Sequence, residues 1–155
     1  MKIVKLISIL LVLISYSLSE EVKNTKSDPT KEYITNLDEA KGLARRYGRH
    51  LLLIAIATDI NEESKNLKAT ILEDDNFQKW LFSEYVAVIL DYPKENTDKA
   101  LIDISRDYQL TGFPTAIILD EYDKEIGRTD WNEGSYNKFI ANLKRLEYMA
   151  KHKTD

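Results

Sequence analysis

The sequence predicts one α/β domain in which a central mixed β-sheet is flanked by helices. Three continuous apolar runs have the composition of strands that are buried on both faces, namely His50–Ala57, Tyr85–Leu90 and Thr115–Leu119. Segments in which apolar residues recur at helical spacing separate these runs. The chain has 155 residues, of which 43% are apolar and 31% charged, and this size and composition are typical of a single globular domain.

The first helix is expected at about Leu37–Tyr47. Either Thr35 or Asn36 has a side chain that can cap its N-terminus. Gly48 follows its last residue, at the position where glycine commonly ends a helix. The residues that form its apolar face are Leu37, Ala40, Leu43, Ala44 and Tyr47.

A second helix is expected after the first apolar run. Asp59 precedes Glu62 by three residues, which is the spacing of a capping box, and acidic residues suit the positive N-terminal end of a helix. Asp74 and Asp75 are expected to interrupt this helix before a second helical piece at Asn76–Phe82. The residues expected to face the core are Leu67, Ile71 and Leu72.

The second half of the chain predicts two further helices and a β-hairpin. One helix is expected at Thr97–Tyr108, and Asp120–Lys124 has the composition of a turn that leads to a returning strand at Glu125–Thr129. Gly134 opens the final helix, whose expected inward residues are Phe139, Ile140, Leu143, Leu146 and Tyr148–Ala150. Because helices separate the three apolar runs, we expect a parallel core to which the hairpin adds antiparallel pairing.

Residues 1–19 have the pattern of a secretory signal peptide. Lys2 and Lys5 precede an apolar run at Leu6–Ile14, and small residues follow where a cleavage site is expected. This run is shorter than the roughly 20 residues that cross a bilayer. We therefore expect export to a periplasmic, lumenal or extracellular compartment, with an uncleaved signal anchor as the alternative. The expected divisions are a signal peptide at 1–19, a polar leader at 20–32, the folded domain at 33–150 and a tail at 151–155.

The composition excludes several classes of chemistry. The chain has no cysteine, which rules out disulfides, thiolate nucleophiles, cysteine-ligated zinc and iron–sulfur clusters. It has two histidines, too few for a His-rich metal site, and its net charge of −4 argues against nucleic-acid binding. Asp59, Glu62 and Glu63 are interpreted as a solvated helix start, because no calcium-loop pattern surrounds them. We expect no metal, no cofactor and no nucleic-acid partner.

The chain resembles the thioredoxin fold in three segments, which read LLLIAIATDINEESKNL, DDNFQKWLFSEYVAVILDY and DYQLTGFPTAIILDEYDKEIGR. The third segment is the most specific, because Gly112-Phe113-Pro114-Thr115 opens a strand after a β-α-β-α order. The resemblance covers about residues 33–148 and is closest to secreted thioredoxin-like proteins with an extended helix after the active-site loop. It implies a thioredoxin-like sheet and a cis peptide bond between Phe113 and Pro114.

The residues that carry redox activity in that family are replaced in this chain. When Lys65-Asn66-Leu67 is used as the anchor, the two cysteines of the family's Cys-x-x-Cys fall at Asn61 and Ser64. The buried carboxylate that many thioredoxins hold beneath the dithiol falls near Ala55. Thiol–disulfide exchange needs an attacking and a resolving thiol, and neither an amide nor a hydroxyl replaces them. The resemblance therefore implies a redox-inactive member without catalytic residues.

The retained Phe113–Pro114 loop implies a peptide-binding surface, since in the family this loop pairs with an extended substrate backbone. The candidate binding residues are Thr58, Asp59, Ile60, Phe113 and Pro114. The leading hypothesis is an exported, non-catalytic module that binds a protein or peptide and meets a membrane only if the signal is uncleaved. Three alternatives stay open: a turn that serves the fold alone, an enzyme with family-inferred redox or non-thiol chemistry, and a scaffold for oligomerisation.

Overall fold

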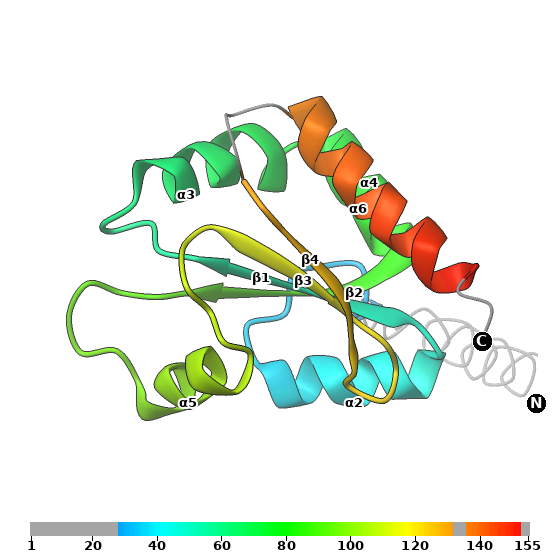
Figure 1. Cartoon of the computed structure of the whole chain (residues 1–155), viewed down its shortest axis with the longest axis horizontal. Helices are drawn as coiled ribbons and strands as arrows, with labels where there is room; N and C mark the ends of the chain where they lie inside the picture. Colours follow the sequence, from blue (N-terminus) through cyan, green and yellow to red (C-terminus); the bar gives the residue numbers. More distant parts are fainter. Residues whose placement is uncertain (1–27, 132–135, 153–155) are drawn as a thin grey trace, which may run out of the picture.

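The computed structural model describes residues 28–131 and 136–152, so the predicted signal peptide, most of the leader and the last three residues lie outside the described part. A four-stranded sheet lies between two layers of helices (Figure 1). Helices α2 and α5 cover one face of the sheet, and α3, α4 and α6 cover the other (Figure 1). The predicted arrangement of a mixed sheet flanked by helices is confirmed.

The strands lie in the order β2-β1-β3-β4. Strand β1 (His50–Ile56) pairs in parallel with β2 (Tyr85–Asp91) and antiparallel with β3 (Thr115–Leu119). Strand β3 pairs antiparallel with β4 (Glu125–Asp130), as predicted for the hairpin. The prediction that β3 belongs to a parallel core is therefore wrong.

The position of α5 (Lys99–Asp107) accounts for this orientation. Figure 1 shows α5 near the end of the sheet at which β2 finishes, and β3 starts from that same end.

Helix α2 (Leu37–Tyr47) has the predicted bounds. The side chain of Asn36 accepts a hydrogen bond from the backbone N–H of Glu39 at 3.0 Å, so Asn36 is the N-cap. Gly48 follows with a φ of 59°, a left-handed conformation that glycine adopts without steric cost. Both ends of this helix are thus determined by local side-chain chemistry.

The second helical region consists of three pieces: α3 (Glu62–Leu67), a π-helical turn η1 (Lys68–Leu72) and α4 (Asp75–Glu84). Asp74 caps α4 through the N–H of Phe77, so the predicted interruption before this helix is confirmed. The predicted capping box is wrong. Asn61 is the N-cap of α3, because the helix begins at Glu62 and Asp59 lies in the preceding turn.

Helix α6 (Tyr136–Lys151) packs against the face that carries α3 and α4, and its predicted start at Gly134 lies outside the described residues. Phe139 and Leu143 are buried as predicted. The side chains of Tyr148 and Met149 are 63% and 55% exposed, so the prediction that they face the core is wrong. No described helix is long and apolar enough to cross a membrane.

The strands carry apolar side chains on both faces, which creates two cores. Alternate residues of β1 contribute to each core; Leu51, Leu53 and Ala55 face α2, and Leu52, Ile54 and Ile56 face α3, α4 and α6. Such burial on both faces requires the uninterrupted apolar runs seen in the sequence. Trp131 is buried and Trp80 is half-buried, and both pack in the core on the side of α3, α4 and α6.

Candidate functional site

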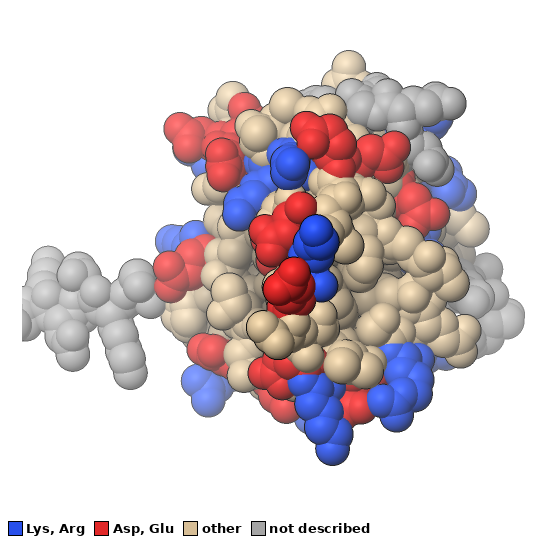
Figure 2. Space-filling model, turned by 90° about the vertical axis from the view of Figure 1, so that its left-hand side faces the viewer, with Lys and Arg blue, Asp and Glu red and all other residues tan. Residues whose placement is uncertain are grey.

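The sheet brings the two segments of the predicted binding surface together. In the antiparallel pair of β1 and β3, Ala55 lies opposite Thr115. The loop that follows β1 therefore lies beside the Phe113–Pro114 loop that precedes β3. Figure 2 shows this end of the molecule, where an uncharged area lies beside a column of acidic and basic side chains.

The loop after β1 is tied to the end of β2. The backbone N–H and the hydroxyl of Thr58 both donate to the carboxylate of Asp91, at 2.9 Å and 2.6 Å. The N–H groups of Ile60 and Asn61 donate to the carbonyl of Ala57, which closes the turn. Asp59 is exposed, and the side chain of Ile60 is 58% exposed. Hydrogen bonds to Asp91 and Ala57 thus fix the loop, while the apolar side chain of Ile60 remains accessible to a partner.

The second segment has a cis peptide bond between Phe113 and Pro114. The ring of Phe113 packs on Tyr92, with the centroids 4.8 Å apart, and Pro114 is buried. The carbonyl of Pro114 accepts from the N–H of Trp131 at 3.4 Å. By contrast, the N–H and carbonyl of Phe113 have no hydrogen-bond partner among the described residues. This leaves one backbone donor and one acceptor available at the loop.

Tyr92 makes the underside of this loop apolar. Tyr92 is buried, and its hydroxyl has no hydrogen-bond partner within the described part of the chain. Burial raises the pKa of the Tyr92 hydroxyl to about 12. Tyr92 therefore stays neutral at physiological pH and acts as a packing surface for Phe113.

Asn61 and Ser64, the positions equivalent to the family dithiol, both serve the start of α3. The side-chain oxygen of Asn61 accepts from the N–H of Ser64 at 2.7 Å. Ser64 is fully buried, and its hydroxyl oxygen accepts from the N–H of Ala57 at 3.1 Å. Ala55 is also fully buried and supplies no titratable group. This geometry provides neither an accessible nucleophile nor a proton relay beneath one.

The contact between Ser64 and Ala57 yields a stability prediction. Replacing Ser64 by alanine leaves the buried N–H of Ala57 without its partner, so we expect the free energy of unfolding to fall by about 1–2 kcal/mol. Urea denaturation checks this value. Ser83→Ala is the matched control, because that hydroxyl is exposed and its loss is expected to change stability little. Equal stability of the two variants contradicts the proposed role of Ser64.

Charged residues near the loop do not form a metal or hydrolase site. Over the described ranges, no group of three or more His, Asp or Glu side chains is arranged to hold a metal ion. Glu62 pairs with Lys65 at 3.2 Å on an exposed helix face. His50 lies at the opposite end of β1, where its Nδ1 is 3.1 Å from a carboxylate oxygen of Glu147, so it does not meet Ser64.

Sequence reasoning missed Asp91 and Tyr92 as part of this site. Asp91 positions the β1 loop through Thr58, and Tyr92 supports Phe113. The available signal was a polar residue followed by an aromatic residue at the end of an apolar strand. That pattern indicates the end of a strand but does not say which loop the two side chains contact.

Comparison with solved structures assigns the architecture to the thioredoxin-like fold. The structure is similar to the oxidoreductase DsbH, with a TM-score of 0.68 and 15% sequence identity over 86% of this chain and 99% of that chain. It is similar to a thioredoxin from Thermus thermophilus, with a TM-score of 0.62 and 16% identity over 80% of this chain and 98% of that chain. A poplar thioredoxin h gives a TM-score of 0.56 and 13% identity, over 75% and 95% of the respective chains.

No protein-family model matches the chain, and no curated protein sequence matches it either. The likeness to the solved structures therefore concerns the fold. The chain has the thioredoxin-like fold that its sequence predicts, and it contains no cysteine.

Proposed function

We propose that this chain is an exported, non-catalytic thioredoxin-like module that binds extended segments of protein partners. The binding surface consists of the Thr58–Ile60 loop and the Phe113–Pro114 loop. The observation that carries the proposal is the free N–H and carbonyl of Phe113, on a loop that adjoins the loop with the exposed side chain of Ile60. An extended peptide pairs with such backbone groups and places an apolar side chain on the neighbouring surface.

The non-catalytic part of the proposal is supported by what Asn61 and Ser64 do. Both side chains form hydrogen bonds within the start of α3, and Ser64 is fully buried. Thiol exchange has no thiol to use in this chain, because the sequence contains no cysteine. In an insulin-reduction assay we expect no turnover above that of the boiled protein, and turnover above that level contradicts the proposal.

Binding is tested with a permanently unfolded probe, fluorescein-labelled reduced and carboxymethylated lactalbumin, by fluorescence anisotropy. Ile60→Glu replaces an exposed apolar contact by a charge, and we expect the affinity to fall about tenfold, since burial of one Ile side chain contributes about 1.5–3 kcal/mol. Ile102→Glu is the matched control, because Ile102 is 49% exposed on α5, outside the proposed surface.

Two outcomes contradict the proposed surface. One is equal affinity of the wild type and Ile60→Glu for the unfolded probe. The other is an equal loss of affinity in Ile60→Glu and Ile102→Glu, which indicates a general effect of added negative charge. Circular dichroism of both variants checks that the fold is retained.

A further inference from the structure

Exposed aromatic and apolar side chains gather at the end of the domain where β1 and β2 begin. Helix α2, the turn between β3 and β4, and helix α6 all reach this end, which is opposite the two binding loops (Figure 1). The large apolar side chains that these elements expose are Tyr47, Tyr122, Tyr148 and Met149. The side chain of Tyr122 is 80% exposed. Such a group of side chains on one surface indicates a site of contact with a partner.

Contacts within the domain hold these elements together at one end. Leu51 at the start of β1 lies opposite Leu119 at the end of β3, so the turn of the hairpin lies beside the start of β1. The Nδ1 atom of His50 is 3.1 Å from a carboxylate oxygen of Glu147 on α6. A pocket of about 450 Å³ between the hairpin and the end of α6 is lined in part by Met149. The exposed side chains therefore belong to one surface.

The same end carries basic side chains that are not neutralised. Arg45 and Arg46 are exposed in the last turn of α2, and Lys124 is exposed in the turn of the hairpin. Among residues 28–131 and 136–152, none of these three side chains forms an ion pair. We call this surface the basic end. Several acidic side chains here already have basic partners, in the pairs Lys41–Asp123, Arg128–Glu125, His50–Glu147 and Lys151–Glu147.

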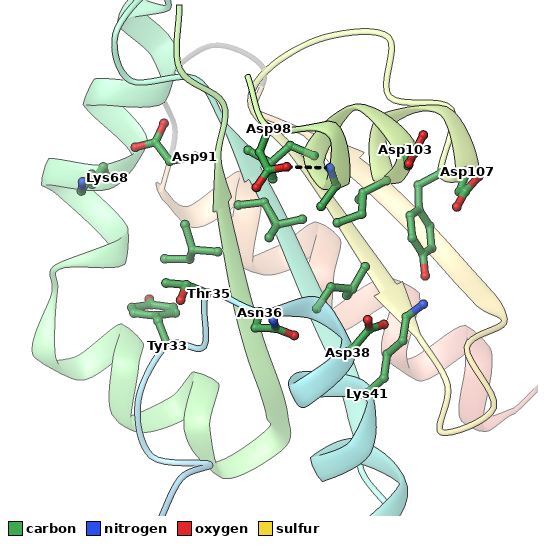
Figure 3. A pocket seen from close by; sticks show the side chains of 17 residues that line it. Tyr33, Thr35, Asn36, Asp38, Lys41, Lys68, Asp91, Asp98, Asp103 and Asp107 are labelled. Carbon is green, nitrogen blue, oxygen red and sulfur yellow. Dashed lines mark hydrogen bonds between the residues drawn. The ribbon is translucent and has the colours of Figure 1, made fainter. Parts of the chain in front are cut away.

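The opposite end of the domain carries acidic side chains. Asp59, Glu62 and Glu63 lie just after β1, and the side chains of all three are exposed or half-buried at the surface. Where β2 ends, Asp91 and Asp98 line a cleft, as Figure 3 shows. The charges are thus distributed unevenly along the strands. An anionic surface therefore attracts the basic end and repels the end with the binding loops.

The described part of the chain also starts at the basic end. Arg49, which lies between α2 and β1, donates to the hydroxyl of Thr30 at 3.3 Å and to the carbonyl of Tyr85 at 2.8 Å. Tyr85 is the first residue of β2, so Thr30 lies at the end where the strands begin. Residues 20–27 join this point to the predicted signal peptide, whose apolar run enters a membrane during export.

We propose that the basic end docks on the surface of a bilayer that contains anionic phospholipids. Arg45, Arg46 and Lys124 meet the lipid phosphates, as basic residues do at anionic membrane surfaces. The rings of Tyr122 and Tyr148 enter the interfacial layer, where an apolar ring with a polar hydroxyl is favoured. A bilayer explains the aromatic side chains, the unpaired cations and the point at which the chain is joined to its predicted signal peptide.

This orientation directs the surface assigned under the proposed function away from the bilayer. Strand β1 has seven residues and spans about 23 Å between the two ends. The Thr58–Ile60 loop therefore remains accessible to a protein partner while the basic end is docked. Docking does not depend on binding at that loop, so Ile60→Glu is expected to leave the membrane contact unchanged.

The experiment measures which end of the domain contacts the lipid. Because the chain has no cysteine, a single introduced cysteine carries a single nitrobenzoxadiazole label. The full chain is mixed with vesicles of phosphatidylcholine and phosphatidylglycerol that include a lipid with a nitroxide on its head group, which quenches a label at the bilayer surface. We expect strong quenching for the label at Met149→Cys and little for Glu63→Cys, the matched control at the opposite end.

The cations are tested in the chain labelled at Met149→Cys. Arg45→Gln combined with Arg46→Gln is expected to lower the ratio of docked to undocked domain about tenfold at saturating lipid. Lys94→Gln combined with Lys99→Gln removes the same charge at the opposite end and is expected to leave this ratio unchanged. Urea denaturation of both double variants checks that the fold is retained.

Three results overturn the proposal. One is equal quenching of the labels at Glu63→Cys and Met149→Cys, which indicates a domain with no preferred orientation. Another is undiminished quenching in the arginine double variant. The third is a blue shift of the Met149→Cys label that grows with protein concentration in the absence of lipid, because it assigns the basic end to contacts between copies of the chain. The assay with the unfolded probe involves no lipid, so the proposed function and membrane docking fail separately.

Discussion

Replacing Phe77 by alanine is expected to lower the free energy of unfolding by about 3–5 kcal/mol. Phe77 of α4 is 1% exposed and belongs to the core between the sheet and α3, α4 and α6. Its ring centroid lies 5.6 Å from that of Trp80 and 6.4 Å from that of Phe139. The substitution removes this ring from a site where α4 and α6 meet the sheet, and leaves a cavity that rigid neighbours fill only in part.

Urea denaturation at neutral pH measures this loss. Phe82→Ala is the matched control, because Phe82 lies on the same helix but is only half-buried. Its ring packs against Tyr33, which is also half-buried. We expect a clearly smaller loss for Phe82→Ala. Equal losses in the two variants mean that α4 is not anchored by Phe77.

Replacing Glu147 by glutamine is expected to lower the free energy of unfolding by about 2 kcal/mol at pH 7. The Glu147 carboxylate lies 3.1 Å from His50 Nδ1 and 3.1 Å from Lys151 Nζ, and it accepts from the Tyr85 hydroxyl at 3.0 Å. It thereby connects α6 to the starts of β1 and β2. Glutamine keeps the shape of the side chain but removes the charge that strengthens these contacts.

The effect of this substitution depends on pH. Burial raises the pKa of Glu147, but hydrogen bonds from His50 and Lys151 outweigh burial, so the folded-state pKa lies below the ordinary value of 4.5. The unfolded chain therefore binds this proton more readily than the folded chain, and acid favours unfolding. The contribution of Glu147 is present above pH 4.5 and is lost as the pH falls through the folded-state pKa.

We therefore expect the stability difference between wild type and Glu147→Gln to shrink as the pH is lowered below 4.5. Urea denaturation at a series of pH values from 7 to 3 tests this. Glu73→Gln is the control, because Glu73 is exposed and is expected to show a small difference at every pH. A difference for Glu147→Gln that stays constant over the series contradicts the assigned role of its charge.

The candidate site was predictable in part. The resemblance placed the loop after β1 and the Phe113–Pro114 loop in one surface, and the pairing of Ala55 with Thr115 brings the two loops together. The roles of Asp91 and Tyr92 were not predictable, because each contacts a segment more than 20 residues away in the chain. The true cap of α3 was also missed, since Asp59 and Asn61 are both good capping residues and the turn geometry selects between them.

The sequence by itself determined the features that depend on near neighbours. Uninterrupted apolar runs specify the buried strands, helical spacing and capping residues specify α2, and the absence of cysteine excludes thiol chemistry. Only the tertiary structure decided the antiparallel orientation of β3 and the exposure of Tyr148. These features depend on where a connecting helix packs on the sheet and where a neighbouring element stops. Both result from packing across the whole sheet, and local sequence patterns do not contain them.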